Sequence, residues 1–332
     1  MQISSLIEVI DAKLESTPSI SHIYAFKTEL KRVKESDLFF AKNIDEANLA
    51  IKNGAFAIVY EENLLVSDNE IAWLKVKNLY EAKVKLLRYL LANLNIQAFY
   101  CNDISYALLK IYHKQSTKNI YLFSNNINKL LNKIETIKQN DFLISNNKKL
   151  LGNIYPHTSS FEKKFSQNSI KNQITHSLFE TSFSYKNSYF SKIKLASIYI
   201  NEFINTFNFL NTNLDLLKLK DFLYLKPIFL DKSLKPIEFG KSDSFLICQE
   251  KNELITKEIT FIMDNFKYAK YTIFSKHKFQ TINNLEINII QDLQTLKYKL
   301  KQDSFNLVYL VGFNYKEVLE FFSSSNQPQT LF

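Results

Sequence analysis

The chain has 332 residues, 46% of them hydrophobic and 14% aromatic, a composition that indicates a packed core and excludes general disorder. No apolar run reaches the roughly 18 residues that a membrane-spanning helix needs. The first 16 residues carry acidic side chains and lack a basic segment before a long apolar stretch, so we expect no signal peptide. Cys101 and Cys248 are too few for a disulfide framework or a metal cluster, and a cytoplasmic location is expected.

The formal net charge of +9 raises the question of nucleic-acid binding. Arg32 and Arg88 are the only arginines among 42 basic residues, although arginine is the side chain best suited to phosphate and guanine. The abundance of Lys, Asn, Ile, Phe and Tyr is the usage expected from an AT-rich genome. Nucleic-acid binding is therefore an alternative that the composition disfavours, and binding that weakens steeply with salt would reveal it.

Apolar spacing in the first third predicts alternating helices and strands. A helix is expected over residues 3–15, with Ile3, Leu6, Ile7, Ile10 and Leu14 on one face. A second helix, over residues 45–53, is expected to begin at Asp45 as its N-cap and to end at Gly54, because glycine tolerates the positive φ of the C′ position. The other expected elements here are strands at 20–26, 37–40, 55–60 and 74–76 and a helix at 80–94.

The same alternation continues to the end of the chain and predicts α/β units with mostly parallel strands. Residues 145–175 carry the weakest signals, and residues 178–193 predict a hairpin that turns at Lys186 and Asn187. Further helices are expected at 105–113, 126–138, 197–210, 214–223, 253–266, 291–302 and 315–322. Further strands are expected at 98–100, 120–123, 141–144, 229–239, 245–248, 271–274, 287–290 and 307–311.

Two sequence blocks indicate a known family. Residues 36–62 read SDLFFAKNIDEANLAIKNGAFAIVYEE, and residues 73–95 read WLKVKNLYEAKVKLLRYLLANLN before the apolar strand IQAFY. This order resembles the N-terminal part of the Mur ligases, ATP-dependent enzymes that build the peptide stem of peptidoglycan. The resemblance is specific over about residues 20–112 and is nearest to the member that adds D-alanyl-D-alanine.

The resemblance implies an α/β fold of three-layer domains with mostly parallel sheets and a reduced central domain. It places an N-terminal-like domain at residues 1–94, a degenerate ATPase-like central domain at 95–250, and a C-terminal-like α/β domain at 251–332.

The family's ATP-binding loop is missing from its expected place. Where the family has a glycine-rich loop ending in Gly-Lys-Thr, this chain has Cys101-Asn102-Asp103-Ile104-Ser105-Tyr106. Such a loop needs glycines to wrap phosphates, a lysine to neutralise them and a hydroxyl for Mg²⁺. We therefore interpret Cys101, Asn102, Asp103 and Ser105 as a vestigial nucleotide loop, in which Asn102 and Asp103 cap the following helix.

Two further patterns in the chain mimic reactive sites. Gly240-Lys241-Ser242 lacks the upstream glycine and the following helix of a phosphate loop, so we expect a surface turn. Cys101 precedes a helix, a position that lowers a thiol pKa, but the sequence positions no base beside it. The five histidines show no metal-like spacing, and no metal site is predicted.

The family's other ligand residues are also reduced in this chain. The segment that helps hold the uridine nucleotide corresponds to residues 29–37, where Val33 and Asp37 match; Lys31, Ser36 and Asp37 are the candidates for residual ligand binding. In the central domain we place no counterpart of the Mg²⁺-binding glutamate, the histidine or the carbamylated lysine. Asn252 is the one remnant of the family's Asp-Asp-x-Tyr-Asn-x-Asn-Pro signature.

Together these features predict a pseudoenzyme without ATP-dependent ligase activity. Its expected role is binding or regulation in peptidoglycan precursor synthesis, with a pathway protein or a UDP-muramoyl metabolite as partner and no cofactor. The alternative is a divergent but active amino-acid or dipeptide ligase, which would require ATP and Mg²⁺.

Overall fold

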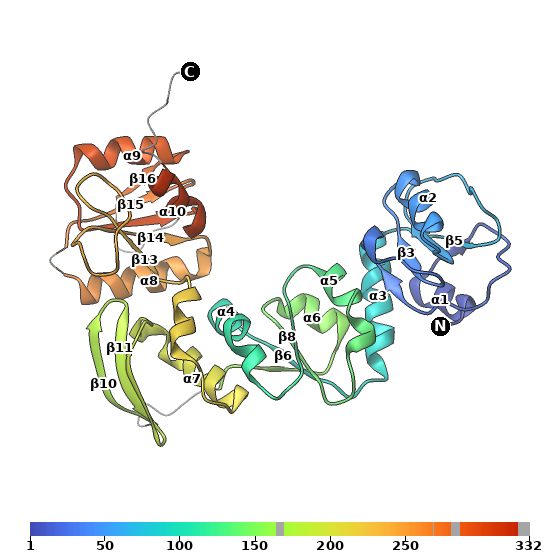
Figure 1. The fold of residues 1–332 in the computed structure, drawn as a ribbon, viewed down its shortest axis with the longest axis horizontal. Coiled ribbons are helices and arrows are strands. Elements are labelled where there is room, and N and C mark those ends of the chain that lie inside the picture. Colours follow the sequence, from blue (N-terminus) through green and yellow to red (C-terminus); the bar gives the residue numbers. More distant parts are fainter. Residues whose placement is uncertain (164–168, 268, 280–285, 325–332) are drawn as a thin grey trace. The chain divides into compact units, whose positions relative to one another are not determined.

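The computed structural model describes residues 1–163, 169–267, 269–279 and 286–324 (Figure 1). Contacts along the chain divide it into two compact units. Unit 1 comprises residues 1–163 and 208–212, and unit 2 comprises residues 164–207 and 213–332. The three predicted domain ranges stay a prediction.

Unit 1 begins with a five-stranded sheet between two layers of helices. Its strand order is β1-β5-β4-β3-β2, with β1 antiparallel to β5 and the other pairs parallel. The strands are β1 (Lys13–Leu14), β2 (Phe26–Lys27), β3 (Leu38–Phe40), β4 (Ala57–Tyr60) and β5 (Ala72–Lys75). The helices are α1 (Ile3–Ile10), α2 (Ile44–Lys52) and α3 (Leu79–Ala92). Alternate strand residues enter two separate cores, one shared with α1 and α3 and the other with α2, as the period of two in a strand requires.

The second sheet of unit 1 is wholly parallel, in the order β7-β8-β6-β9. Its strands are β6 (Gln97–Tyr100), β7 (Ile120–Phe123), β8 (Phe142–Ser145) and β9 (Thr158–Ser160), and its helices are α4 (Asp103–Tyr112), α5 (Ile127–Leu131) and α6 (Lys148–Ile154). Leu86, Leu87 and Leu91 of α3 share one core with buried residues of α5 and α6. Helix α3 therefore shares a hydrophobic core with both sheets of unit 1.

Unit 2 holds an antiparallel meander of β10 (Ile170–Ser177), β11 (Glu180–Tyr185) and β12 (Ser188–Ile193), followed by α7 (Ile200–Leu210). Its larger sheet has the order β13-β14-β17-β15-β16, and only β13 is antiparallel. These strands are β13 (Pro227–Phe229), β14 (Phe245–Gln249), β15 (Tyr271–Ser275), β16 (Ile287–Ile289) and β17 (Leu307–Val311). Helices α8 (Asn252–Asn265), α9 (Leu293–Gln302) and α10 (Tyr315–Ser324) follow β14, β16 and β17.

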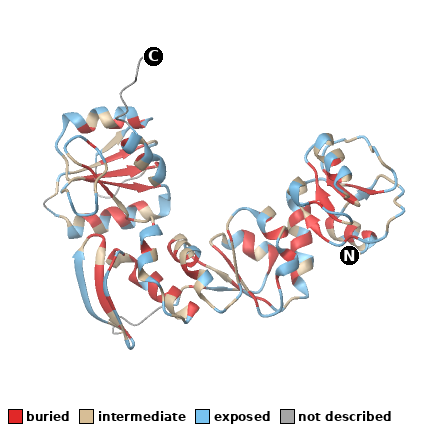
Figure 2. Ribbon diagram, in the orientation of Figure 1, coloured by how far each residue is buried: buried red, intermediate tan, exposed pale blue. Residues whose placement is uncertain are grey.

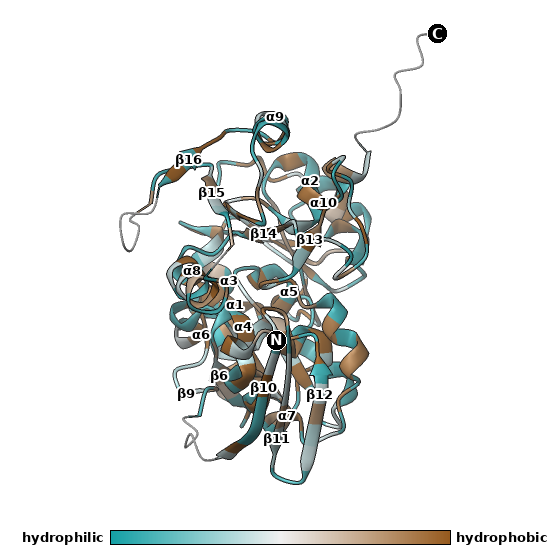
Figure 3. Cartoon of the chain, turned by 90° about the vertical axis from the view of Figure 1, so that its left-hand side faces the viewer, coloured by the Kyte–Doolittle hydropathy of each residue, from teal (hydrophilic) through white to brown (hydrophobic). Residues whose placement is uncertain are grey.

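Helices α8 and α9 cover opposite faces of this larger sheet (Figure 1). Its central strands β14 and β17 are buried along their whole length (Figure 2). Helix α9 combines a hydrophobic side with a hydrophilic one (Figure 3), and Leu293, Leu296 and Leu300 make up its buried residues. The predicted α/β class with mostly parallel sheets is confirmed.

Several expected element boundaries were wrong, each for a local reason. The first helix ends at Ile10 because Asp11 adopts a left-handed conformation with φ of 50°. Leu14 then pairs with Leu74 as part of β1. The N-cap of α2 is Asn43, whose side chain accepts a hydrogen bond from the Glu46 amide, and Asp45 lies in the first turn instead.

The weakly patterned stretch contains elements that the sequence did not reveal, namely α6, β9 and β10. The helix expected at 126–138 is broken into α5 and a 3-10 turn, and the helix expected at 214–223 is a 3-10 helix over Leu216–Asp221. Within the described ranges, no helix has both the length and the apolar character needed to cross a membrane.

Candidate functional site

The junction of β6 and α4 is where the resemblance places the ATP loop. Two residues, Cys101 and Asn102, join the last residue of β6 to the first residue of α4. Asn102 is the N-cap, and its Oδ1 accepts a hydrogen bond from the Ser105 amide at 2.8 Å. The amide of Asn102 itself donates to Glu162 Oε1 at 2.8 Å. The chain thus supplies its own acceptors at a helix start that would otherwise attract an anion.

Carboxylates gather at this helix start. Asp103 lies in the first turn of α4, and its Oδ1 accepts a hydrogen bond from Asn146 Nδ2 at 2.5 Å. Together with Glu162, it places negative charge at the end of α4 where the helix dipole is positive. That arrangement stabilises the helix and repels a triphosphate. The residues at this junction do not fit ATP.

The side chains in the positions of the family's lysine and threonine are largely enclosed. Ser105 is fully buried, and its Oγ has no hydrogen-bond partner among the described residues. Tyr106 is partly buried, and burial raises the pKa of its hydroxyl to about 12. Neither side chain is placed to neutralise a phosphate or to hold Mg²⁺.

Cys101 is an inert thiol in this setting. Its side chain is buried and lies 3.7 Å from the Ser145 carbonyl oxygen. Burial raises its pKa well above the ordinary range, and the carboxylates of Glu162 and Asp103 raise it further. The thiolate needed for nucleophilic attack is therefore suppressed.

The three candidates for residual ligand binding have different surroundings. Ser36 and Asp37 lie in one turn, where the buried Asp37 carboxylate accepts a hydrogen bond from the Lys34 amide at 2.9 Å. Ser36 has φ of 70°, and its amide donates to the Gly54 carbonyl oxygen at 3.1 Å. Lys31 lies in a 3-10 turn, exposed to solvent, with its ammonium 3.9 Å from Glu29. Asp37 thus holds the turn, and Lys31 is open to an incoming ligand.

The remaining sequence motifs do not form a nucleotide or metal site in the described residues. Gly240 and Lys241 lie in an exposed turn that leads into strand β14, as expected. Asn252 begins helix α8. In the described part of the chain, no group of three or more His, Cys, Asp or Glu side chains is arranged to hold a metal ion.

A buried polar cluster in unit 2 was not recognised from the sequence. Glu258 of α8 is fully buried and accepts hydrogen bonds from Tyr199 Oη, Gln249 Nε2 and Tyr309 Oη, the last two at 2.7 and 2.5 Å. Burial raises the pKa of this carboxyl, although the three donors and Lys257 act in the opposite direction. Gln249 and Tyr309 belong to strands β14 and β17 and Tyr199 to a 3-10 turn, so the cluster ties α8 to its sheet and to that turn.

No protein-family model matches the sequence, and no curated protein matches it. The structure is nonetheless similar to solved structures of Mur ligases. The MurF ligase from Thermotoga maritima in complex with ADP is 13% identical, with a TM-score of 0.53 over 90% of this chain and 97% of that one. MurF from Acinetobacter baumannii is 10% identical, with a TM-score of 0.56 over 98% of both chains. The chain therefore has a Mur-ligase-like fold.

Proposed function

We propose that this chain is a Mur-ligase-like protein that has lost ATP-dependent ligation and acts by binding in peptidoglycan precursor synthesis. The observation that carries the proposal is the closed helix start at α4. Glu162 and Asn102 accept hydrogen bonds from two amides at this helix start, and only two residues join β6 to α4. The proposal includes a cytoplasmic location and no bound cofactor.

The proposed ligand is a UDP-muramoyl metabolite, because the fold is that of ligases in this pathway and Lys31 remains open to solvent. Its site would lie beside the turn of Ser36 and Asp37, where the exposed ammonium of Lys31 can meet a diphosphate. A protein of the same pathway is the other partner in the proposal.

Thermal unfolding of the full chain tests both halves of the proposal. Mg·ATP should leave the melting temperature unchanged, whereas UDP-N-acetylmuramic acid or a peptide derivative should raise it. A ligand at about a hundred times its dissociation constant adds roughly 2.7 kcal/mol, which is readily measured. A shift with Mg·ATP would overturn the loss of nucleotide binding. No shift with any muramoyl compound would reject the metabolite and leave a protein partner.

Matched variants locate the metabolite site. Lys31→Ala should reduce the muramoyl-dependent shift, whereas Lys52→Ala, an exposed lysine at the end of α2, should not. Equal effects of the two substitutions would show that general positive charge, and not this turn, attracts the ligand.

A divergent active ligase is the second candidate, supported by a fold that covers nearly the whole length of the solved ligases. Release of phosphate from ATP that depends on a UDP-muramoyl peptide and D-alanyl-D-alanine would establish it. A flat baseline with every stem-peptide intermediate would remove it.

A further inference from the structure

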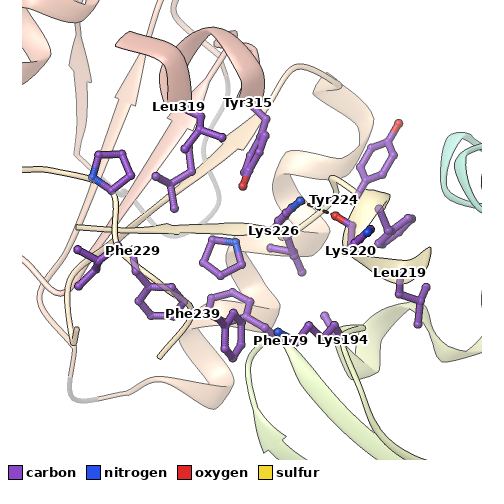
Figure 4. A pocket seen from close by; sticks show the side chains of 17 residues that line it. Phe179, Lys194, Leu219, Lys220, Tyr224, Lys226, Phe229, Phe239, Tyr315 and Leu319 are labelled. Carbon is purple, nitrogen blue, oxygen red and sulfur yellow. Dashed lines mark hydrogen bonds between the residues drawn. The ribbon is translucent and has the colours of Figure 1, made fainter. Parts of the chain in front are cut away.

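Unit 2 contains a cavity of about 240 Å³ beside the edge strand β13. Its walls come from five parts of the unit: the β10–β11 turn at Phe179, the residues after β12 at Lys194, the segment 219–229, residues 236–239 before β14, and α10 with Tyr315 (Figure 4). A cavity of about 150 Å³ holds a benzene ring, and drug-sized ligands need roughly 300 Å³ or more. This volume suits a single ring with one small substituent.

One end of the cavity is an aromatic platform. Phe179, Phe229 and Phe239 lie with ring centroids 5.2–6.2 Å apart in edge-to-face arrangements. Phe239 is 37% exposed, so part of this platform is open to a ligand. Aromatic rings in this geometry favour a further ring against their faces or edges.

The same cavity is lined by three lysines, Lys194, Lys220 and Lys226, and by no acidic side chain. Lys226 is half-buried, and its ammonium donates a hydrogen bond to the Lys220 carbonyl oxygen and lies 5.1 Å from the Tyr315 ring centre. The Lys194 ammonium lies 4.4 Å from the ring centre of Phe239. Among the described residues, none of the three lysines forms an ion pair.

The electrostatic surroundings of Lys226 favour an anionic ligand in the cavity. Burial lowers the pKa of its ammonium, and nearby Lys194 adds to this effect, while Asp221 opposes it. A half-buried cation without an ion-pair partner is costly, and an anion in the cavity would relieve that cost.

A neighbouring cavity of about 440 Å³ provides an internal comparison. It shares Phe179, Phe229 and Phe239 with the first cavity but is lined by Glu180 and no lysine. The same aromatic platform therefore has a cationic side and an acidic side, and only the first is suited to an anion.

We propose that the lysine-lined cavity of unit 2 binds a small organic anion with one aromatic ring. The ring packs against Phe179, Phe229 and Phe239, and the anionic group meets the ammonium groups of Lys226 and Lys194. This inference does not rest on the proposed function, because the vestigial loop and the turn at Ser36 belong to unit 1.

Calorimetric titration of the full chain with four single-ring probes tests the proposal: phenylacetate, phenyl phosphate, the neutral phenylacetamide and the cationic 2-phenylethylamine. At least one anion should bind tenfold or more tightly than the amide, about the effect of one desolvated charge pair. The better of the two anions then identifies a carboxylate or a phosphate ligand. Equal affinity for the anions and the amide, tighter binding of the amine, or no binding up to about 10 mM would overturn the proposal.

Variants separate the charge from the platform. Lys226→Met should weaken the anion at least tenfold without changing the amide, and Lys226→Arg should retain anion binding. Phe239→Ala should weaken anion and amide alike. Lys232→Met, an exposed lysine outside the cavity, is the matched control and should have no effect. An anion affinity that Lys226→Met leaves unchanged, in a variant with an unaltered circular dichroism spectrum, would also overturn the proposal.

Discussion

Gly54 should be essential to unit 1 because both its backbone and its surroundings exclude a side chain. It follows α2 with φ of +96°, a conformation that L residues rarely adopt. A Cβ there would lie 2.9 Å from Glu35 Cα and 3.0 Å from Glu35 N, which are backbone atoms that cannot swing away. The Gly54 carbonyl oxygen also accepts the hydrogen bond from Ser36, so a shift of the backbone would disturb that turn.

These two effects give the size of the loss for Gly54→Ala. A positive φ costs an L residue roughly 1–2 kcal/mol, and overpacking typically costs about 1–3 kcal/mol. The free energy of unfolding of unit 1 should therefore fall by about 2–5 kcal/mol. Gly152→Ala is the matched control: Gly152 lies inside α6 with ordinary φ, and its Cβ would meet no atom within 4 Å. That substitution should stabilise unit 1 by about 0.5–1 kcal/mol.

Urea unfolding followed by tryptophan fluorescence measures both variants. The chain has a single tryptophan, Trp73, which is fully buried in β5 and reports on unit 1. At an m-value of about 1–3 kcal/mol/M, Gly54→Ala should lower the urea midpoint by about 0.7 M or more. A midpoint at or above that of the natural chain would refute the reasoning, as would an equal loss in Gly152→Ala.

The remaining predictions concern buried and capping groups. The Glu258 carboxyl has a raised pKa in the folded chain, so the free energy of unfolding should fall as pH rises from the ordinary glutamate pKa of 4.5 through the folded pKa. Glu258→Gln should remove this pH dependence, which amounts to at most about 1.4 kcal/mol per pH unit. The exposed Glu253→Gln should retain it. In urea titrations, Glu162→Ala should destabilise unit 1 by about 1 kcal/mol because the hydrogen bond from the start of α4 is lost. The exposed Glu62→Ala should cause no change. Cys101 and Cys248 are both buried with raised pKa values, so Ellman's reagent should label neither in the native chain and both in urea; rapid native labelling of Cys101 would contradict its inert assignment.

Local signals in the sequence predicted the scaffold well. Gly54 has the expected positive φ, and the hairpin turns at Lys186, which has φ of 51°. Asn102 caps α4, as its position before an apolar helix indicates. These features depend on a few neighbouring residues, so one stretch of sequence contains all the information that determines them.

Features that depend on distant residues could not be predicted. Leu14 continues the helical spacing of the first ten residues, but its pairing with Leu74 of β5 overrides that periodicity. Glu162 accepts its hydrogen bond from an amide 60 residues earlier in the chain. From the sequence, Glu258 would be expected at the protein surface. Only the fold brings Tyr199 and Tyr309 to its carboxylate. Strand β10 is polar and exposed, so it lacks the alternation that marks a half-buried strand.

The proposed loss of nucleotide binding rests on the backbone as well as on side chains. A phosphate-binding loop is a strained, glycine-rich connection that is useful only when it holds its ligand. Here β6 passes into α4 through two residues, and Asn102 caps the start of the helix. A lysine in place of Ser105 would bury a charge at a fully enclosed position, which is costly.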